Sequence, residues 1–283
     1  MSSEKQSEPG AGKVSLVVAD VDGTLLTEDK RLTPRAQQAV RSLQASGVAF
    51  AVTSGRPPRG MAMLIEPLAL TEPLAGFNGG TYVRPDLSVI ERRVLDPAVA
   101  RAAAALIKVH ELDLWIYSER DWLVRDPDAP HVAREAWTVK FPPTVTPDFG
   151  SALDDAVKLV GVSDDHARVA RAEAALREAL GTTASAARSQ PYYLDVTNPQ
   201  ANKGMVVRTM SRILSIPAAE IATIGDMPND ILMFRESGVS IAMGNAGPEV
   251  KAAANHVTDA NSADGFAKAM ERFVLRRQEG TTS

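Results

Sequence analysis

The chain alternates between short, continuously apolar segments and amphipathic ones. Residues 14–19 form an apolar run with β-branched side chains, which predicts a strand buried on both faces of a parallel sheet. Apolar positions then recur at helical spacing from Thr33-Pro34, a cap followed by proline, to Gly47. Residues 48–53 form a second apolar run. A strand, a helix and a strand joined in this way predict two parallel strands with a right-handed crossover.

The same alternation returns near the carboxyl end. Strands are predicted at 220–225 and 239–243, and helices at 203–215, 228–237, 248–254 and 263–276. The two ends of the chain therefore predict one α/β domain, a Rossmann-like core built on a parallel sheet.

The middle of the chain has a different pattern. Helices are predicted at about 97–110 and at 166–180, where Gly181 ends the second one. Strand-like segments occur at 112–118, 121–126, 156–162, 183–187 and 192–197, with Glu119-Arg120 as a hairpin turn between the first two. Many strands and two clear helices predict an α+β unit with an antiparallel sheet, inserted into the parallel-sheet domain.

These patterns predict a division of the chain into domains. We expect a catalytic core at 13–85 and 193–283, with an inserted cap domain at 86–192 that selects the substrate. Residues 1–12 are rich in Ser, Glu and Gly and have no apolar period, so they predict a flexible tail.

Composition narrows the class of protein. Among 283 residues, 31 basic and 35 acidic ones give a net charge of -4, so no broad cationic surface predicts nucleic acid or anionic membrane as a partner. No segment reaches the roughly 18 apolar residues of a membrane-spanning helix, and residues 1–12 lack the apolar part of a secretory signal. We expect a cytoplasmic protein that acts on a small molecule. The absence of cysteine excludes disulfides and thiolate catalysis.

Carboxylates gather where strands end. Asp20 and Asp22 follow the first strand, and Asp226 and Asp230 follow the strand at 220–225. Ligand sites in parallel sheets lie at the carboxyl ends of the strands, so the four side chains are expected to converge there. Like charges so close cannot all remain ionised unless cations compensate them, which implies a divalent metal and a lysine. Oxygen ligands without a cysteine or a histidine cluster favour Mg²⁺ over zinc.

Two further segments complete the expected site. Lys203 and the backbone of Ser54-Gly55 can hold the oxygens of a phosphoryl group that do not bind the metal. Taken singly, each segment has a simpler interpretation. The first acidic motif alone can be a strand followed by a turn. Ser54-Gly55-Arg56 alone can be a strand-ending turn, and Lys203 alone can be a solvated lysine at a helix start. A calcium loop would need Gly and Glu where Leu25 and Arg31 stand.

The segments together resemble the haloacid dehalogenase superfamily of phosphotransferases. The four matching motifs are Asp20-Val21-Asp22-Gly23-Thr24-Leu25-Leu26, Ser54-Gly55-Arg56, Lys203-Gly204 and Gly225-Asp226-Met227-Pro228-Asn229-Asp230. Phe77-Asn78-Gly79-Gly80 resembles a segment typical of the Cof-like branch, subfamily IIB, whose α/β cap lies between the second and third motifs. The resemblance covers Lys13 to Val274. It departs mildly from the common pattern at Ala19, where a bulkier residue is frequent, and at Ser54, where threonine is commoner.

The resemblance implies a role for each matching residue. Asp20 would be the nucleophile that forms an aspartyl-phosphate, and Asp22 the acid that protonates the leaving oxygen and then activates water. Magnesium would bind the Asp20 and Asp226 carboxylates and the Asp22 carbonyl. Asp230 and Asn229 would support the metal waters or the phosphate.

The remaining motif residues would contact the substrate. Ser54, Gly55 and Lys203 would surround the phosphoryl group, and Arg56 and Asn78 would lie near the substrate. Asp195, just before the third motif, is interpreted either as a hinge or substrate residue or as a surface acid beside a turn. Packing of a small sheet is expected to explain most of five aromatic residues, and one or two of them are candidates to line the substrate pocket: Trp115, Trp122, Trp137, Tyr192 and Tyr193. The four histidines show no metal spacing.

Three functions follow as hypotheses. The first is a magnesium-dependent phosphatase of small phosphate monoesters, such as sugar phosphates or phosphorylated cofactors. The second is a phosphomutase or phosphotransferase of the same superfamily, which would pass the phosphoryl group to an acceptor other than water. The third is a non-catalytic phosphate-sensing module, against which Asp22 argues because a sensor needs no general acid. The sequence leaves the oligomeric state and the particular substrate open.

Overall fold

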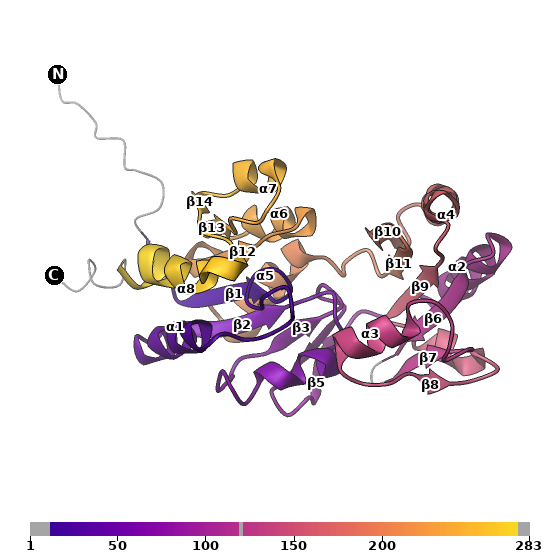
Figure 1. Ribbon diagram of the computed structural model, residues 1–283, viewed down its shortest axis with the longest axis horizontal. Helices are drawn as coiled ribbons and strands as arrows, with labels where there is room; N and C mark the ends of the chain where they lie inside the picture. Colours follow the sequence, from indigo (N-terminus) through magenta and orange to yellow (C-terminus); the bar gives the residue numbers. More distant parts are fainter. Residues whose placement is uncertain (1–11, 119–120, 277–283) are drawn as a thin grey trace, which may run out of the picture. The chain divides into compact units, whose positions relative to one another are not determined.

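The computed structural model describes residues 12–118 and 121–276 (Figure 1). Of the tail expected at 1–12 it describes Gly12 alone, and the turn expected at Glu119-Arg120 lies outside the described residues. The chain divides into two compact units. Among the described residues, the first contains 12–53, 66–72 and 203–276, and the second contains 54–65, 73–118 and 121–202. This division rests on internal packing, and the domain limits inferred from sequence stay a prediction.

The first unit contains five parallel strands in the order β14-β13-β12-β1-β2 (Figure 1). Their bounds are β1 Leu16–Asp20, β2 Ala49–Thr53, β12 Ile221–Gly225, β13 Val239–Ala242 and β14 His256–Val257. Every residue of β1, β12 and β13 is buried, as their apolar runs predict. Strand β1 has β2 on one side and β12 on the other. Its carboxyl end is therefore the point where the winding of the sheet reverses, which is where α/β proteins bind ligands.

Helices flank this sheet in two groups. Their bounds are α1 Pro34–Ala45, α5 Lys203–Leu214, α6 Ile231–Phe234, α7 Pro248–Ala253 and α8 Gly265–Ala269, which continues as a π-helix over Met270–Leu275. Helix α1 packs against α8, whereas α6 packs against α5 and α7. The right-handed crossovers from β1 to β2 and from β12 to β13 run in opposite directions along the sheet, which places their helices on opposite faces. The helix expected at 228–237 is shorter, because a 3₁₀ turn over Pro228–Asp230 precedes α6.

The second unit contains mostly antiparallel strands. Strands β3 Leu74–Gly76, β4 Thr81–Val83 and β5 Val89–Arg92 form one antiparallel set. A six-stranded sheet has the order β10-β11-β9-β6-β7-β8. Its strands are β6 Asp113–Tyr117, β7 Trp122–Val124, β8 Thr144–Val145, β9 Lys158–Val162, β10 Ser185–Gln190 and β11 Tyr193–Thr197. All pairs in this sheet are antiparallel except β7 with β8.

The two faces of the six-stranded sheet bury different side chains. Helices α2 Pro97–Val109 and α4 His166–Leu180 pack aliphatic residues against one face, where Ile116 and Leu159 lie. The other face carries Trp115 and Tyr117 and packs against α3 Val132–Val139. Strand alternation sends neighbouring residues of β6 to opposite faces, which explains why one strand serves both cores. Helix α3 was not predicted from sequence, because its eight residues are too few for a clear helical period.

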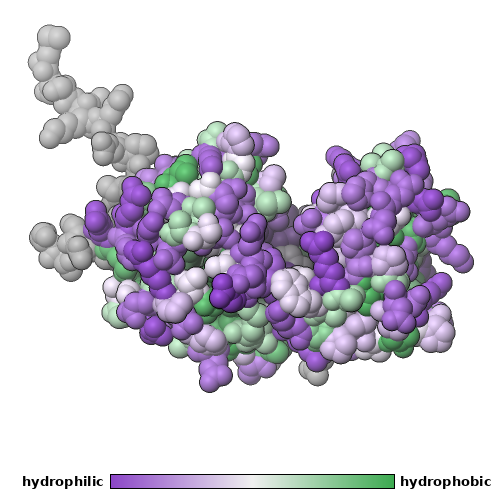
Figure 2. Space-filling model, in the orientation of Figure 1, coloured by the Kyte–Doolittle hydropathy of each residue, from purple (hydrophilic) through white to green (hydrophobic). Residues whose placement is uncertain are grey.

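Polar residues dominate the face of the molecule drawn in Figure 2, with small apolar patches between them. The large apolar side chains that are exposed are Val109, Trp137, Val145, Met227, Leu232 and Val257. Trp137 thus differs from the packing role expected for it. Within the described ranges, no helix combines the length and apolar character needed to cross a membrane.

Candidate active site

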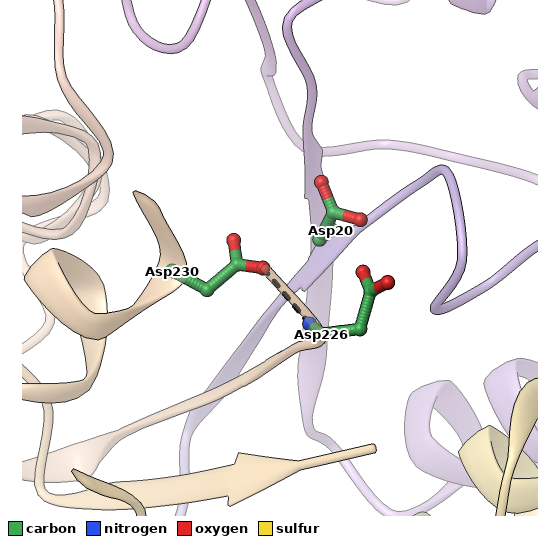
Figure 3. A group of neighbouring side chains, drawn as sticks. All are labelled: Asp20, Asp226 and Asp230. Atoms are coloured by element: carbon green, nitrogen blue, oxygen red, sulfur yellow. Dashed lines mark hydrogen bonds between the residues drawn. The ribbon is translucent and has the colours of Figure 1, made fainter. Parts of the chain in front are cut away.

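Asp20, Asp226 and Asp230 form a buried cluster at the carboxyl edge of the parallel sheet (Figure 3). Asp20 is the last residue of β1, and Asp226 follows directly after β12. One oxygen of each carboxylate lies within 4.8 Å of an oxygen of the others. The adjacency of β1 and β12 creates this cluster, since it aligns the ends of two strands that lie about 200 positions apart in the sequence.

Lys203 supplies the cation that the acidic cluster needs. Its Nζ donates to Asp20 Oδ1 at 2.6 Å and also forms a short contact with Asp230 Oδ1. The lysine begins helix α5, and its side chain is 2% exposed. When all three carboxylates are ionised, the one ammonium leaves two negative charges in a buried space. The donor set and this residual charge both fit a divalent metal ion, because hard dications prefer carboxylate oxygens.

Burial sets the protonation of these groups in the metal-free protein. It raises the pKa of Asp20 to about 8; the Lys203 ammonium opposes this shift, and the charges of Asp230 and Asp226 add to it. Burial, followed by the charge of Asp230, raises the pKa of Asp226 to about 6. Burial also disfavours the charged form of Lys203, but Asp20 and Asp230 outweigh it and raise the pKa of the lysine. A cation placed here would therefore compete with protons for the carboxylates.

Backbone groups hold Asp230 in place. Its Oδ2 accepts a hydrogen bond from the backbone N–H of Asp226 at 2.9 Å (Figure 3) and another from the backbone N–H of Met227 at 2.8 Å. The carboxylate therefore caps the turn that follows β12 while its other oxygen faces Lys203. A Cβ at Gly225 would lie 2.3 Å from Asp230 Cγ, so this turn requires glycine.

Asp226 is oriented by side chains from two loops. Thr24 Oγ1 donates to its Oδ1 at 3.1 Å, and Asn245 Nδ2 donates to its Oδ2 at 3.2 Å. Asn245 also donates to the carbonyl of Gly23 at 2.9 Å and so joins the two loops. The sequence reasoning missed Asn245. The available signal was its place just after the strand at 239–243, since polar residues that follow neighbouring parallel strands converge.

Asp22 lies outside the three-carboxylate cluster. Its Oδ1 is 2.6 Å from Lys30 Nζ, and its side chain is 28% exposed. The charge of Asp22 nevertheless contributes to raising the pKa of Asp226, so the two carboxylates are electrostatic neighbours. The fourth motif also contains Asn229, which is exposed on the 3₁₀ turn. The roles expected for Asp22 and Asn229 stay predictions.

The second unit contains the Ser54-Gly55-Arg56 motif and Asn78. The backbone N–H of Asn78 donates to the carbonyl of Ser54 at 2.7 Å. The backbone N–H of Arg56 donates to Ser54 Oγ at 3.1 Å, a geometry in which the hydroxyl proton points to a different acceptor. Arg56 is buried and donates from Nη1 to the carbonyl of Gly60 at 3.3 Å. Ser54 and Asn78 thus lie together within one unit.

Asp195 is neither exposed nor beside a turn. It lies within β11, its Oδ2 is 2.6 Å from Lys158 Nζ, and its side chain is 15% exposed. The interpretation as a surface acid was therefore wrong, because the strand continues through this position. Of the aromatic residues expected to pack the sheet, Trp115, Trp122 and Tyr193 are buried.

The chain belongs to the haloacid dehalogenase-like hydrolases, whose family model matches residues 17–270. A relative in Bacillus subtilis, named 5-amino-6-(5-phospho-D-ribitylamino)uracil phosphatase, is 26% identical over 266 residues, which cover 93% of this chain and 96% of that protein. The family and its named relatives make this chain a phosphatase of haloacid dehalogenase type.

Solved structures agree with this assignment. A haloacid dehalogenase-like hydrolase from Bacteroides thetaiotaomicron has 27% identity and a TM-score of 0.84, with coverage of 92% of this chain and 99% of that one. A sugar phosphatase described as subclass IIB has a TM-score of 0.79 at 23% identity, with coverage of 92% and 99%. At 23% identity, the similarity to this sugar phosphatase concerns the fold alone. A core of parallel strands with a second α/β unit is thus confirmed.

Proposed function

We propose that the protein is a magnesium-dependent phosphatase that hydrolyses small phosphate monoesters through an aspartyl-phosphate. The observation that carries this proposal is the grouping of three buried carboxylates around Lys203, because the residual charge suits a dication and a phosphoryl group together. Asp20 and Asp226 are the side chains that would hold the metal, with the carbonyl of Asp22 as a further ligand, and Asp230 would support the metal waters. When bound, Mg²⁺ would neutralise charge on the phosphoryl oxygens.

The chain's own residues divide the chemistry into two steps. In the first, an Asp20 oxygen attacks phosphorus, the ester P–O bond breaks, and Asp22 gives its proton to the leaving oxygen. In the second, Asp22 takes a proton from water, whose oxygen attacks phosphorus and releases Asp20 and inorganic phosphate.

Ser54, Gly55 and Lys203 would bind the oxygens of the transferring group, with Asn229, Asn78 and Arg56 close to the substrate. Chain continuity supports the role of Ser54. It follows Thr53, whose register partner in β1 is Asp20. Lys203 already touches Asp20 and would move between carboxylate and phosphate oxygens with little rearrangement.

The substrate class follows from the relatives. One is named for 5-amino-6-(5-phospho-D-ribitylamino)uracil and another for HMP-PP. We therefore infer a small phosphorylated metabolite, and the ribitylaminouracil phosphate is a candidate to test first. A cytoplasmic location fits such a substrate.

Release of inorganic phosphate from p-nitrophenyl phosphate tests the proposal. We expect turnover with Mg²⁺, loss on addition of EDTA, and loss by at least about 10⁴-fold in Asp20→Asn. The matched control is Asp259→Asn, the same exchange at an exposed ion pair with Lys268 in the same unit, which should keep full activity. Acid quenching during turnover should trap phosphate covalently on the wild-type protein. Full activity of Asp20→Asn, or an exchange of phosphate between positions of a sugar without release, would reject a hydrolase with this nucleophile.

A further inference from the structure

A short hairpin between β1 and α1 directs a lysine at Asp22. Leu26 and Leu32 pair in it as an antiparallel bridge, and the backbone N–H of Lys30 donates to the carbonyl of Thr27 at 2.9 Å. Lys30 Nζ lies 2.6 Å from Asp22 Oδ1. All five residues belong to the first unit, so this contact does not depend on where the second unit lies.

Side chains fix the conformation of this hairpin. Thr27 Oγ1 donates to Asp29 Oδ1 at 2.6 Å and accepts a hydrogen bond from the backbone N–H of Arg31 at 3.1 Å. Asn261, which follows β14, donates from Nδ2 to a backbone carbonyl of the hairpin at 3.0 Å. The turn that carries Lys30 is therefore held in place by bonds other than its ion pair.

The backbone of Lys30 is in a conformation that favours glycine. Its φ is +60°, in the left-handed region that is disfavoured for residues with a Cβ. The ion pair compensates little of this cost, because the Lys30 and Asp22 side chains are 22% and 28% exposed and such pairs contribute little to stability. Non-glycine residues kept in this region are concentrated at functional sites. Folding stability therefore does not explain why a lysine stands at this turn.

Asp22 adjoins the acidic cluster that would carry the reaction. It follows Asp20 by two residues, and its charge adds to the effect of burial in raising the pKa of Asp226. A carboxyl group that exchanges a proton with a reacting atom needs a fixed orientation, which a neighbouring group normally provides. An ammonium donates hydrogen bonds and accepts none, so its contact with Oδ1 orients the carboxyl group and assigns the exchangeable proton to Oδ2.

We infer that Lys30 is a positioning residue that orients Asp22 for proton transfer to the leaving oxygen. This inference rests on the proposed phosphatase function and adds to it a residue outside the four motifs. The proton passes from Asp22 to the leaving oxygen as the ester P–O bond breaks, and water returns a proton to Asp22 in the second step. Lys30 keeps its own protons throughout, because Oδ1 can accept from the ammonium in both forms of Asp22.

Lys30→Met is the first variant, because it removes the ammonium and keeps a long apolar side chain. We expect kcat/KM for the most active alkyl phosphate of a panel to fall about 10- to 100-fold, since an alkoxide leaves poorly until it is protonated. For p-nitrophenyl phosphate, kcat/KM should change by less than about twofold. Nitrophenolate leaves without a proton, and kcat/KM includes only the steps up to its release.

Two further variants separate positioning from charge and from folding. Lys268→Met is the matched control, because it makes the same exchange at an ion pair with Asp259 in the same unit, and it should change kcat/KM for neither substrate. Lys30→Gly should be about as stable as wild type in thermal unfolding, because relief of the left-handed backbone offsets the greater freedom of glycine in the unfolded chain. Its kcat/KM for the alkyl phosphate should nevertheless fall as in Lys30→Met.

Asp22→Asn tests whether Lys30 acts through Asp22. This variant should lower kcat/KM for the alkyl phosphate at least about 100-fold, because it removes the proton donor. Adding Lys30→Met to it should lower kcat/KM by less than about twofold more, since residues that act as one unit do not have additive effects. Effects of the two substitutions that multiply would show that Lys30 acts independently of Asp22, and would overturn the inference.

The remaining outcomes distinguish the inference from the function on which it rests. If wild type hydrolyses both esters and Lys30→Met loses kcat/KM equally for both, or for neither, the phosphatase function holds and the inference is overturned. Lower stability of Lys30→Gly with unchanged kcat/KM would show that Lys30 serves the fold, and would also overturn it. Failure of wild type to hydrolyse any phosphate ester would reject the function and the inference together.

Discussion

Lys203 Nζ lies 2.6 Å from Asp20 Oδ1, and the two residues are 183 positions apart in the chain. Helix α5 brings the lysine to the end of β1, where it is buried with two carboxylates. The ammonium therefore compensates part of the negative charge before any metal or substrate binds. The ion pair between Lys203 and Asp20 therefore affects both the stability of the free protein and the charge of the site.

Replacement of Lys203 by methionine should destabilise the metal-free protein by about 3–5 kcal/mol, because it leaves buried carboxylates without their cation. Mg²⁺ should restore part of this loss. Lys268→Met is the control: its partner Asp259 is half exposed, so the change should cost at most about 1 kcal/mol. Urea unfolding in EDTA and in Mg²⁺ measures both variants. Equal destabilisation of the two would contradict a special role for the buried pair.

Gly23→Ala should reduce kcat about 100-fold by displacing a metal ligand. A Cβ at Gly23 would lie 2.3 Å from Asp226 Oδ2, and the residue has φ +85°. Gly47→Ala is matched to it, since Gly47 has φ +74° and no atom within 4 Å of the added Cβ. Both variants carry a backbone penalty of about 1 kcal/mol, but Gly47→Ala should retain its activity. Steady-state kinetics at saturating Mg²⁺ compare kcat of the two variants. Similar losses of kcat would mean that backbone strain, and not displacement of Asp226, causes the effect.

Asn245→Ala should weaken the apparent affinity for Mg²⁺ about tenfold, because Asp226 loses the amide that orients it. The dependence of phosphatase activity on Mg²⁺ concentration measures this effect. Asn255→Ala removes hydrogen bonds to Ser240 in the same unit and serves as the control. It should lower stability and leave the metal dependence as in wild type. An unchanged Mg²⁺ dependence of Asn245→Ala would show that Asp226 needs no such support.

Without metal, the protein should lose stability as pH rises from about 5 to about 9. The pKa of Asp20 is raised to about 8 and that of Asp226 to about 6, both above the 3.8 of an unperturbed aspartate. At pH values between 3.8 and these raised pKa values, the folded state therefore binds more protons than the unfolded state. The stabilisation that this proton binding provides is lost as pH rises through 6 and then through 8. Thermal unfolding in EDTA across this range measures the effect.

Mg²⁺ should reverse this trend, because ionised carboxylates are its ligands and the stabilisation it provides should grow with pH. Asp20→Asn should flatten the upper part of the metal-free profile, between about pH 7 and 9. A metal-free protein that becomes more stable over this range would contradict the raised pKa values.

Much of the parallel-sheet unit could be predicted from the sequence, for reasons visible in particular residues. The run that contains Leu16 to Ala19 is apolar on both faces, and the Thr33-Pro34 cap marks the start of α1. Helix α3 and the short strands β3 to β5 were not predicted, since three to eight residues give no dependable period. Of the two interpretations of Asp195, the sequence could not exclude the surface acid, because the exposure of this residue depends on the strands beside it.

The sequence by itself determined the family, the central strands, and which carboxylates and lysine belong to the motifs, because these depend on local apolar runs and short spacings. Only the tertiary structure decided how the charges are arranged. It placed Lys203 between Asp20 and Asp230. It also brought Thr24 and Asn245 to Asp226 and paired Asp22 with Lys30. Among the described residues, it left Asp195 Oδ1 without a donor. Distances between residues far apart in the chain follow from strand order and burial, and no local pattern of residues encodes them.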